Sequence, residues 1–399
     1  MTMQRSTQVL TAMILAVALH GACAADEYTL RPYVIHATAS RASSIAIGDV
    51  TGDGRADVVM TTLWDNTPDD DYRVFVFAQN DSGRLDAPTK VSYGQTGGGN
   101  GNALAIGNFD GQAGIDVAVG GGAAGVSVLH ASGSPPWLAL AEIRGTRRSY
   151  ALTTLDLYGR GRADLVSVDR TAGGSKFENQ GNGLFIARRW DIGTIDPFSV
   201  AKGDVDGDGI DDVAAVSYNS QQNIRLYVNT RDGRLTEAAA LVSMCASRPT
   251  EHVAIGDVDS DGIADIVATG GGNQPDGCLQ VLRGLGQMRY ALPLTFASHD
   301  SPSGVIVVDI DRDGRNDVVV SHPGHAKVGI YRQNSSGTLA AETLFFAPHR
   351  SQHNGQNIAV GDFTGDGCND IALAGYYGLG TLEGRGPGCD GIFLDSFER

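Results

Sequence analysis

Long apolar segments, basic clusters and familiar catalytic motifs are missing from this sequence. Beyond its first 24 residues, no stretch approaches the ~20 apolar residues of a membrane-spanning helix. Lys and Arg are too dispersed to indicate a nucleic-acid surface. HExxH and GxSxG do not occur, and no helix is expected after the glycine-rich segments at 97–101 and 120–122. The signatures of zinc proteases, serine hydrolases and phosphate-binding loops are therefore excluded.

Cysteine is also scarce, with five residues in 399. Residues 1–24 have the pattern of a secretory signal peptide, with Arg5 before an apolar stretch and an Ala-x-Ala cleavage site at 22–24. Lipid attachment at Cys23 is an alternative that the preceding His and Gly fit poorly. Cleavage would leave four cysteines, and an even number predicts two disulfides in an exported protein. A secreted, periplasmic or cell-surface location is therefore expected.

What the sequence does contain is an Asp-rich loop, repeated seven times between β-branched runs. Five copies are close: 49–57 (DVTGDGRAD), 204–212 (DVDGDGIDD), 257–265 (DVDSDGIAD), 309–317 (DIDRDGRND) and 362–370 (DFTGDGCND). Two are weaker: 108–116 (NFDGQAGID) and 156–164 (DLYGRGRAD). Their spacing of 48 to 59 residues indicates a repeat architecture. Half of the 46 acidic residues lie in these loops, so the net charge of −16 reflects the loops and not a surface for a basic partner.

The composition of the loop predicts a calcium site. Ca²⁺ prefers six to eight oxygen ligands from carboxylates and carbonyls. Loop positions 1, 3, 5 and 9 carry oxygen side chains, position 6 is a Gly that permits a sharp bend, and position 7 can offer its backbone carbonyl. The predicted ligands are Asp49, Thr51, Asp53, Arg55, Asp57, Asp204, Asp206, Asp208, Ile210, Asp212, Asp257, Asp259, Asp261, Ile263, Asp265, Asp309, Asp311, Asp313, Arg315, Asp317, Asp362, Thr364, Asp366, Cys368 and Asp370. The alternative is that the Asp residues only form Asx-turns, but five close copies favour about five bound Ca²⁺ ions.

The two weaker loops depart from this pattern. In the first of them, Gln112 replaces the Asp of position 5 and Ala113 replaces the Gly of position 6, so weaker calcium binding is expected there. In the second, Tyr158 and Arg160 replace two ligand positions. A guanidinium is expected to lie where the metal would, pairing with Asp156 and Asp164.

Each repeat unit predicts four short strands and no helix. In the first unit the strands are expected at 44–48, 57–62, 73–79 and 90–93. Seven such units match an all-β, seven-bladed propeller, in which radial closure removes long exposed sheet edges. The last unit lacks a fourth strand, and the segment at 28–37 is expected to supply it from the N-terminal side. The expected organisation is a signal peptide at 1–24, a propeller at 25–383 and a tail at 384–399.

The repeated xxIGDxxGDGxxD core and the Asn/Gly turns after the third strands resemble FG-GAP/VCBS repeats, the integrin α-subunit propeller class, over residues 28–383. The resemblance implies that Ca²⁺ binds between the first and second strands on one face. It also implies that ligands meet the opposite face. Cys245 and Cys278 would then share one face, and Cys368 and Cys389 the other. These two disulfide pairings are therefore expected.

Histidines gather in the loops expected on the face away from calcium. Six of the eight histidines after residue 24 lie there: His252, His299, His322, His325, His349 and His353. Exposed loops tolerate His without a function, but mixtures of polar and aromatic side chains also suit a protein or carbohydrate ligand. A transition-metal site is a third interpretation, although the spacing of His322 and His325 matches no known ligand pattern. The candidate ligand face centres on His299, His322, His325 and His353.

Taken together, these features predict an exported calcium-binding propeller that acts as a monomeric binding or adhesion module for a protein or glycan. The alternative is a carbohydrate-active enzyme such as a polysaccharide lyase, which would need a basic residue and carboxylates in one cleft. No catalytic residue is predicted. The last ten residues (DGIFLDSFER) resemble short tails ending in I-F-x-D-x-F-E on some exported bacterial proteins, and that resemblance implies no defined role.

Overall fold

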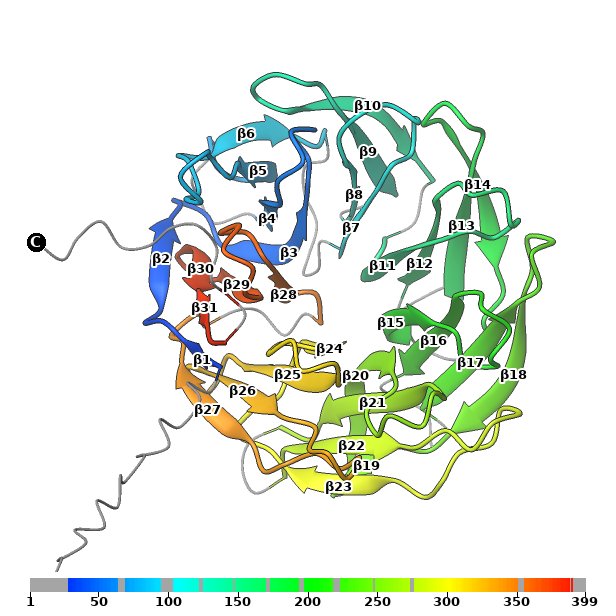
Figure 1. Cartoon of the computed structure of the whole chain (residues 1–399). Helices are drawn as coiled ribbons and strands as arrows, with labels where there is room; N and C mark the ends of the chain where they lie inside the picture. Colours follow the sequence, from blue (N-terminus) through cyan, green and yellow to red (C-terminus); the bar gives the residue numbers. More distant parts are fainter. Residues whose placement is uncertain are drawn as a thin grey trace, which may run out of the picture.

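The computed structural model describes residues 28–63, 69–94, 103–121, 125–145, 148–169, 173–193, 197–217, 223–246, 248–272, 276–350, 355–387 and 389. The predicted signal peptide, His353 and the last ten residues lie outside these ranges. The described residues form seven antiparallel blades around a central axis, as the sequence predicts (Figure 1). None of them forms a helix with the length and hydropathy of a membrane span.

Each blade has four strands, ordered from the axis outward. Blades 1 to 3 comprise β3 (Ala42–Gly48), β4 (Asp57–Thr62), β5 (Arg73–Phe77), β6 (Thr89–Ser92); β7 (Ala103–Gly107), β8 (Asp116–Gly120), β9 (Val126–Ala131), β10 (Leu138–Arg144); and β11 (Ala151–Leu155), β12 (Asp164–Asp169), β13 (Gly173–Asn179), β14 (Phe185–Trp190). Blades 4 and 5 comprise β15 (Pro197–Gly203), β16 (Asp212–Ser217), β17 (Ile224–Asn229), β18 (Leu235–Leu241); and β20 (Arg248–Gly256), β21 (Asp265–Gly270), β22 (Cys278–Leu282), β23 (Leu294–Ala297), with β19 (Met244–Cys245) added to β20. Blades 6 and 7 comprise β24 (Val305–Val308), β25 (Asp317–His322), β26 (Lys327–Tyr331), β27 (Thr343–Phe346); and β28 (Ile358–Gly361), β29 (Asp370–Gly375), β30 (Gly378–Leu382), β2 (Val34–Ala37).

The hydrophobic core lies between neighbouring blades. The second strand of every blade is buried along its whole length. Val59 and Val76 of blade 1, for example, pack in one cluster with Leu104 and Val119 of blade 2. Burying one such side chain stabilises the fold by about 1.5–3 kcal/mol. Packing between blades therefore holds the ring, and the loops at either end of each blade remain available for function.

The two ends of the propeller meet in blade 7. The N-terminal strand β2 pairs with β30, with Val34 opposite Thr381 and Ala37 opposite Gly378. The expected strand at 28–37 is not continuous: β1 (Thr29–Leu30) pairs instead with β31 (Gly384–Arg385). Between β1 and β2 lies Pro32, which has no N–H to donate to a sheet, and the ring closes through two short strands for that reason.

Both expected disulfides are present. Cys245 in β19 bonds to Cys278 at the start of β22, with their Cα atoms 5.5 Å apart. Cys368 in the last Asp loop bonds to Cys389, with a Cα separation of 4.7 Å. In the chain-entropy account, closing a loop of this size stabilises by about 3–4 kcal/mol. The second bond also fixes the chain beyond β31 to the body of the propeller.

Deletion of residues 25–37 is expected to lower the melting temperature and cause concentration-dependent association, because it exposes the edge of β30. Light scattering and calorimetry would measure both effects. Adding a peptide of residues 28–37 should restore the monomer. A deletion variant that stays monomeric with an unchanged melting temperature would show that closure by β2 is dispensable.

Candidate metal centres in the Asp loops

The Asp loops each join the first strand of a blade to its second strand. The first strand ends in Gly at Gly48, Gly107, Gly203, Gly256 and Gly361, and the second strand of all seven blades begins at loop position 9. Every blade runs in the same sense, so all seven loops lie on one face of the ring (Figure 1). The sharp bend at position 6 places Gly54, for example, at a φ of 87°, a backbone conformation that other residues rarely adopt.

Carboxylates converge in three of the close loops. Positions 1, 3 and 9 bring one ligand atom each to within 4.8 Å of one another. These groups are Asp204, Asp206 and Asp212; Asp257, Asp259 and Asp265; and Asp309, Asp311 and Asp317. Three like charges so close together repel one another unless a cation or a proton lies between them.

Position 9 also has a structural role that the sequence did not reveal. In blade 6, the N–H of Ile310 donates to Asp317 Oδ2 at 3.3 Å, and the N–H of Gln333 donates to Oδ1 at 2.8 Å. The carboxylate thus joins the loop to the chain just beyond the third strand, which ends at Tyr331. The same pair of contacts recurs at Asp57, Asp116, Asp164, Asp212, Asp265 and Asp370. This role explains why Asp stands at position 9 even in the loop that Arg160 alters.

Position 5 lies apart from the converging group. Its carboxylate accepts the N–H of position 7 in each close loop, which is an Asx-turn. This applies to Asp53, Asp208, Asp261, Asp313 and Asp366. Arg55 and Arg315 also form ion pairs with Asp53 and Asp313. The structure therefore brings together positions 1, 3 and 9, and places position 5 in the turn.

Three oxygens at loop position 3 are buried without a hydrogen-bond partner among the described residues. They are Thr51 Oγ1, Asp259 Oδ1 and Asp311 Oδ1. Burying an oxygen without a partner costs about 1–3 kcal/mol, so such atoms are rare unless a ligand completes them. All three occupy the position predicted to ligate calcium. The donor set, made of hard oxygens only, fits Ca²⁺.

The raised pKa values of the position-9 carboxylates also favour a bound cation. Burial, with a further contribution from neighbouring carboxylates, raises the pKa of Asp317 to about 7. The same causes raise the pKa of Asp370 to about 7, and those of Asp212 and Asp265 to about 6. Without a cation, these carboxylates are costly to ionise. A divalent ion held by positions 1, 3 and 9 would offset that cost.

The two weaker loops differ from each other. In blade 3, Arg160 Nη2 lies 3.5 Å from Asp164 Oδ1, which confirms that part of the prediction. The contact of Arg160 with Asp156 is made by its backbone N–H and not, as predicted, by the guanidinium. In blade 2, Asp110 and Asp116 converge with His130, a residue that sequence reasoning missed.

His130 lies on the third strand, one residue before the residue that contacts position 9. Arg283 and Arg332 hold the same place in blades 5 and 6, where they pair with Asp259 at 2.8 Å and Asp311 at 3.4 Å. A basic residue at this position of the repeat is the sequence signal that could have predicted that His130 lies beside the Asp loop.

Family comparison agrees with the geometry. FG-GAP-like repeats match residues 204–268 and 309–373, and each match spans two successive close loops. Residues 204–268 and 309–373 of the propeller are therefore FG-GAP-like repeats. No curated protein matches the chain significantly. The FG-GAP-like matches thus include four of the five loops with the predicted calcium ligands.

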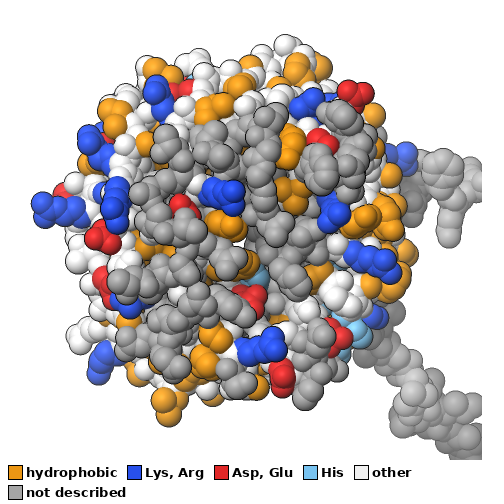
Figure 2. All heavy atoms as spheres, turned by 180° about the vertical axis from the view of Figure 1, so that it is seen from behind, with side chains coloured by type: hydrophobic (Ala, Val, Ile, Leu, Met, Phe, Trp, Pro, Cys, Tyr) orange, Lys and Arg blue, Asp and Glu red, His pale blue; other side chains and the backbone are white. Residues whose placement is uncertain are grey.

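Figure 2 shows the face opposite the Asp loops, and His side chains are visible on it among the described residues. His299 Nδ1 lies 2.8 Å from one oxygen of Glu342, and His322 Nε2 lies 2.6 Å from the other. The side chain of His322 is 0% exposed, whereas that of His299 is 30% exposed. His325 is exposed and stacks on His299 with ring centroids 5.1 Å apart. The structure therefore leaves two of the four predicted histidines accessible, buries His322, and adds Glu342, for which the sequence offered no signal.

Replacement of Asp317 by Asn and of Asp313 by Asn should separate the two roles of the loop. Asp317→Asn is expected to lower stability by about 1–3 kcal/mol even in EDTA, because an amide nitrogen would then face a backbone N–H. Asp313→Asn should leave the melting temperature in EDTA within about 1 °C of wild type, because its turn contact can be kept by the amide oxygen. Equal losses in EDTA would contradict the structural role of position 9.

Proposed function

We propose that this protein is an exported, calcium-stabilised propeller that binds a protein or carbohydrate ligand on the face opposite the Asp loops. Calcium is supported most strongly by the buried oxygens at position 3 of the loops in blades 1, 5 and 6, which have no hydrogen-bond partner among the described residues. The two disulfides agree with an oxidising compartment.

Calcium would act by stabilising the scaffold. An ion that binds only the native state stabilises it by RT ln(1 + [L]/Kd), about 2.7 kcal/mol per site at a hundredfold excess over Kd. Strand β25 begins at Asp317 in the metal loop and ends at His322 on the opposite face. Ordering one end of this buried strand would therefore limit the motion of the loops at its other end.

The proposed ligand surface lies on blades 5 to 7. His299 and His325 form one accessible pair. Tyr376 and Tyr377 form another, 38% and 52% exposed, with ring centroids 4.9 Å apart. Exposed aromatic rings with polar edges suit carbohydrate and protein ligands because each offers both apolar area and hydrogen bonds. Glu342 and buried His322 would hold His299 in a fixed orientation.

A polysaccharide lyase is the second candidate. The observation in its favour is the His299–Glu342 contact, which gives a partly exposed imidazole an orienting carboxylate, as a general base requires. Release of unsaturated ends from acidic polysaccharides would support this function. If His299→Ala abolished this release but still bound the polysaccharide, His299 would be assigned as the general base.

Binding is best tested on glycan and protein arrays with the calcium-loaded chain. We expect His299→Ala/His325→Ala to weaken binding at least tenfold at an unchanged melting temperature, because both side chains are accessible. Arg84→Ala is the control, since it removes an exposed side chain from the other face. Equal binding by the double variant and wild type would show that these histidines are not part of the ligand surface.

A further inference from the structure

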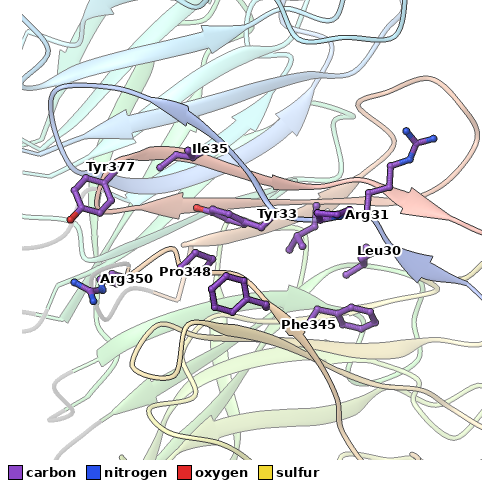
Figure 3. A pocket seen from close by; sticks show the side chains of 11 residues that line it. Leu30, Arg31, Tyr33, Ile35, Phe345, Pro348, Arg350 and Tyr377 are labelled. Atoms are coloured by element: carbon purple, nitrogen blue, oxygen red, sulfur yellow. The ribbon is translucent and has the colours of Figure 1, made fainter. Parts of the chain in front are cut away.

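The outer wall of the propeller is hollowed between blades 6 and 7. A groove of about 840 Å³ lies beside β27 on one side and the segment from β1 to β2 on the other (Figure 3). Its apolar lining includes Leu30, Tyr33, Ile35, Phe345, Phe346 and Pro348. No described strand pairs with the outer edge of β2 or of β27. The groove therefore combines an apolar surface with two strand edges that are free within the described part of the chain.

Large apolar side chains in this groove are exposed to solvent in the described structure. Phe346 is 64% exposed and Ile35 is 44% exposed. Covering apolar area gains about 25 cal/mol per Å². Contiguous exposed apolar area on a soluble domain usually marks a binding site.

The polar groups of the groove specify an acidic occupant. Arg31 and Arg350 line it toward opposite ends (Figure 3). Arg350 forms no ion pair with any other described residue. Arg31 lies 3.7 Å from Glu383, and these two side chains are 55% and 38% exposed. The Tyr33 hydroxyl is buried without a hydrogen-bond partner among the described residues. An occupant with an apolar centre and acidic groups on both sides would satisfy these groups.

The end of this same chain has that composition and starts nearby. Cys389 is fixed to Cys368 and packs in the cluster that Leu30, Tyr33 and Phe345 also contact. The following residues, 390–399 (DGIFLDSFER), place Ile-Phe-Leu between Asp390 and Asp395. Extended chain spans about 3.3–3.6 Å per residue, so ten residues can reach roughly 33–36 Å from Cys389.

We propose that residues 390–399 occupy the groove between blades 6 and 7. Phe393 and its neighbours would cover Phe346 and Ile35, and the acidic residues would lie beside Arg31 and Arg350. The segment would thereby cover the wall where the N-terminal strand closes the ring. This inference does not depend on the ligand proposed for the opposite face.

Hydrogen exchange of the full chain tests the proposal. Phe393→Asp, or shortening the chain to residue 389, is expected to speed amide exchange in β2 and β27 at least tenfold, with no change in β16 of blade 4. Leu292→Asp is the matched control, because Leu292 is 88% exposed on blade 5 and lies outside the groove. A labelled peptide of residues 390–399 should bind the shortened chain, and a scrambled peptide should not.

Charge reversal gives a second measurement that does not depend on removing the segment. Arg350→Glu and Asp395→Arg should each speed exchange in β2 and β27, and the double variant should recover slow exchange. Unchanged exchange on shortening, together with no peptide binding, would overturn the proposal. A concentration-dependent dimer that Phe346→Asp abolishes and shortening does not would also overturn it, and would assign the groove to a second copy of the chain.

Discussion

Repulsion among carboxylates drawn to one point is the constraint on which this propeller depends. The turn that joins the first and second strands of a blade brings loop positions 1, 3 and 9 together, and in blades 4, 5 and 6 all three are Asp. Packing between blades fixes the strands on either side, so the carboxylates cannot separate without loss of the core. Protons, guanidinium groups or a divalent cation are the possible sources of compensation. Arg283 and Arg332 supply part of it in blades 5 and 6, but one oxygen of Asp259 and one of Asp311 still have no hydrogen-bond partner among the described residues.

In blade 3, an arginine side chain supplies positive charge within the Asp loop. Arg160 reaches Asp164 from within the loop, and its guanidinium lies 4.1 Å from the centre of the Tyr158 ring. The position-9 carboxylate keeps its two backbone contacts there. The blade therefore needs Asp at position 9 for its architecture, whereas the carboxylates at the other positions would serve to hold a cation. If so, loss of one ion would not by itself unfold a blade.

Much of this architecture could be predicted from the sequence because it follows from local, repeated patterns. The seven units and their four strands come from periodicity, and both disulfide pairings come from the loop faces that the family resemblance implies. The sequence does carry a signal for the interruption of the expected strand at 28–37, because Pro32 has no N–H to donate to a sheet. Other features depend on contacts between distant residues. The burial of His322 depends on Glu342, and the amide of Gln356 bonds to Leu104 and Leu152 of two other blades at 2.7 and 2.9 Å. No pattern along the chain indicates such contacts.

The central claim is that calcium holds the propeller together, and calorimetry of the same preparation in excess Ca²⁺ and in EDTA tests it most directly. Several native-state sites, each contributing about 2.7 kcal/mol at a hundredfold excess of ion, should produce a large fall in melting temperature on chelation. Restoring Ca²⁺ should reverse that fall, and Mg²⁺ at equal concentration should do so poorly because it demands a smaller octahedral site. A melting temperature that is the same in Ca²⁺ and EDTA would contradict the account.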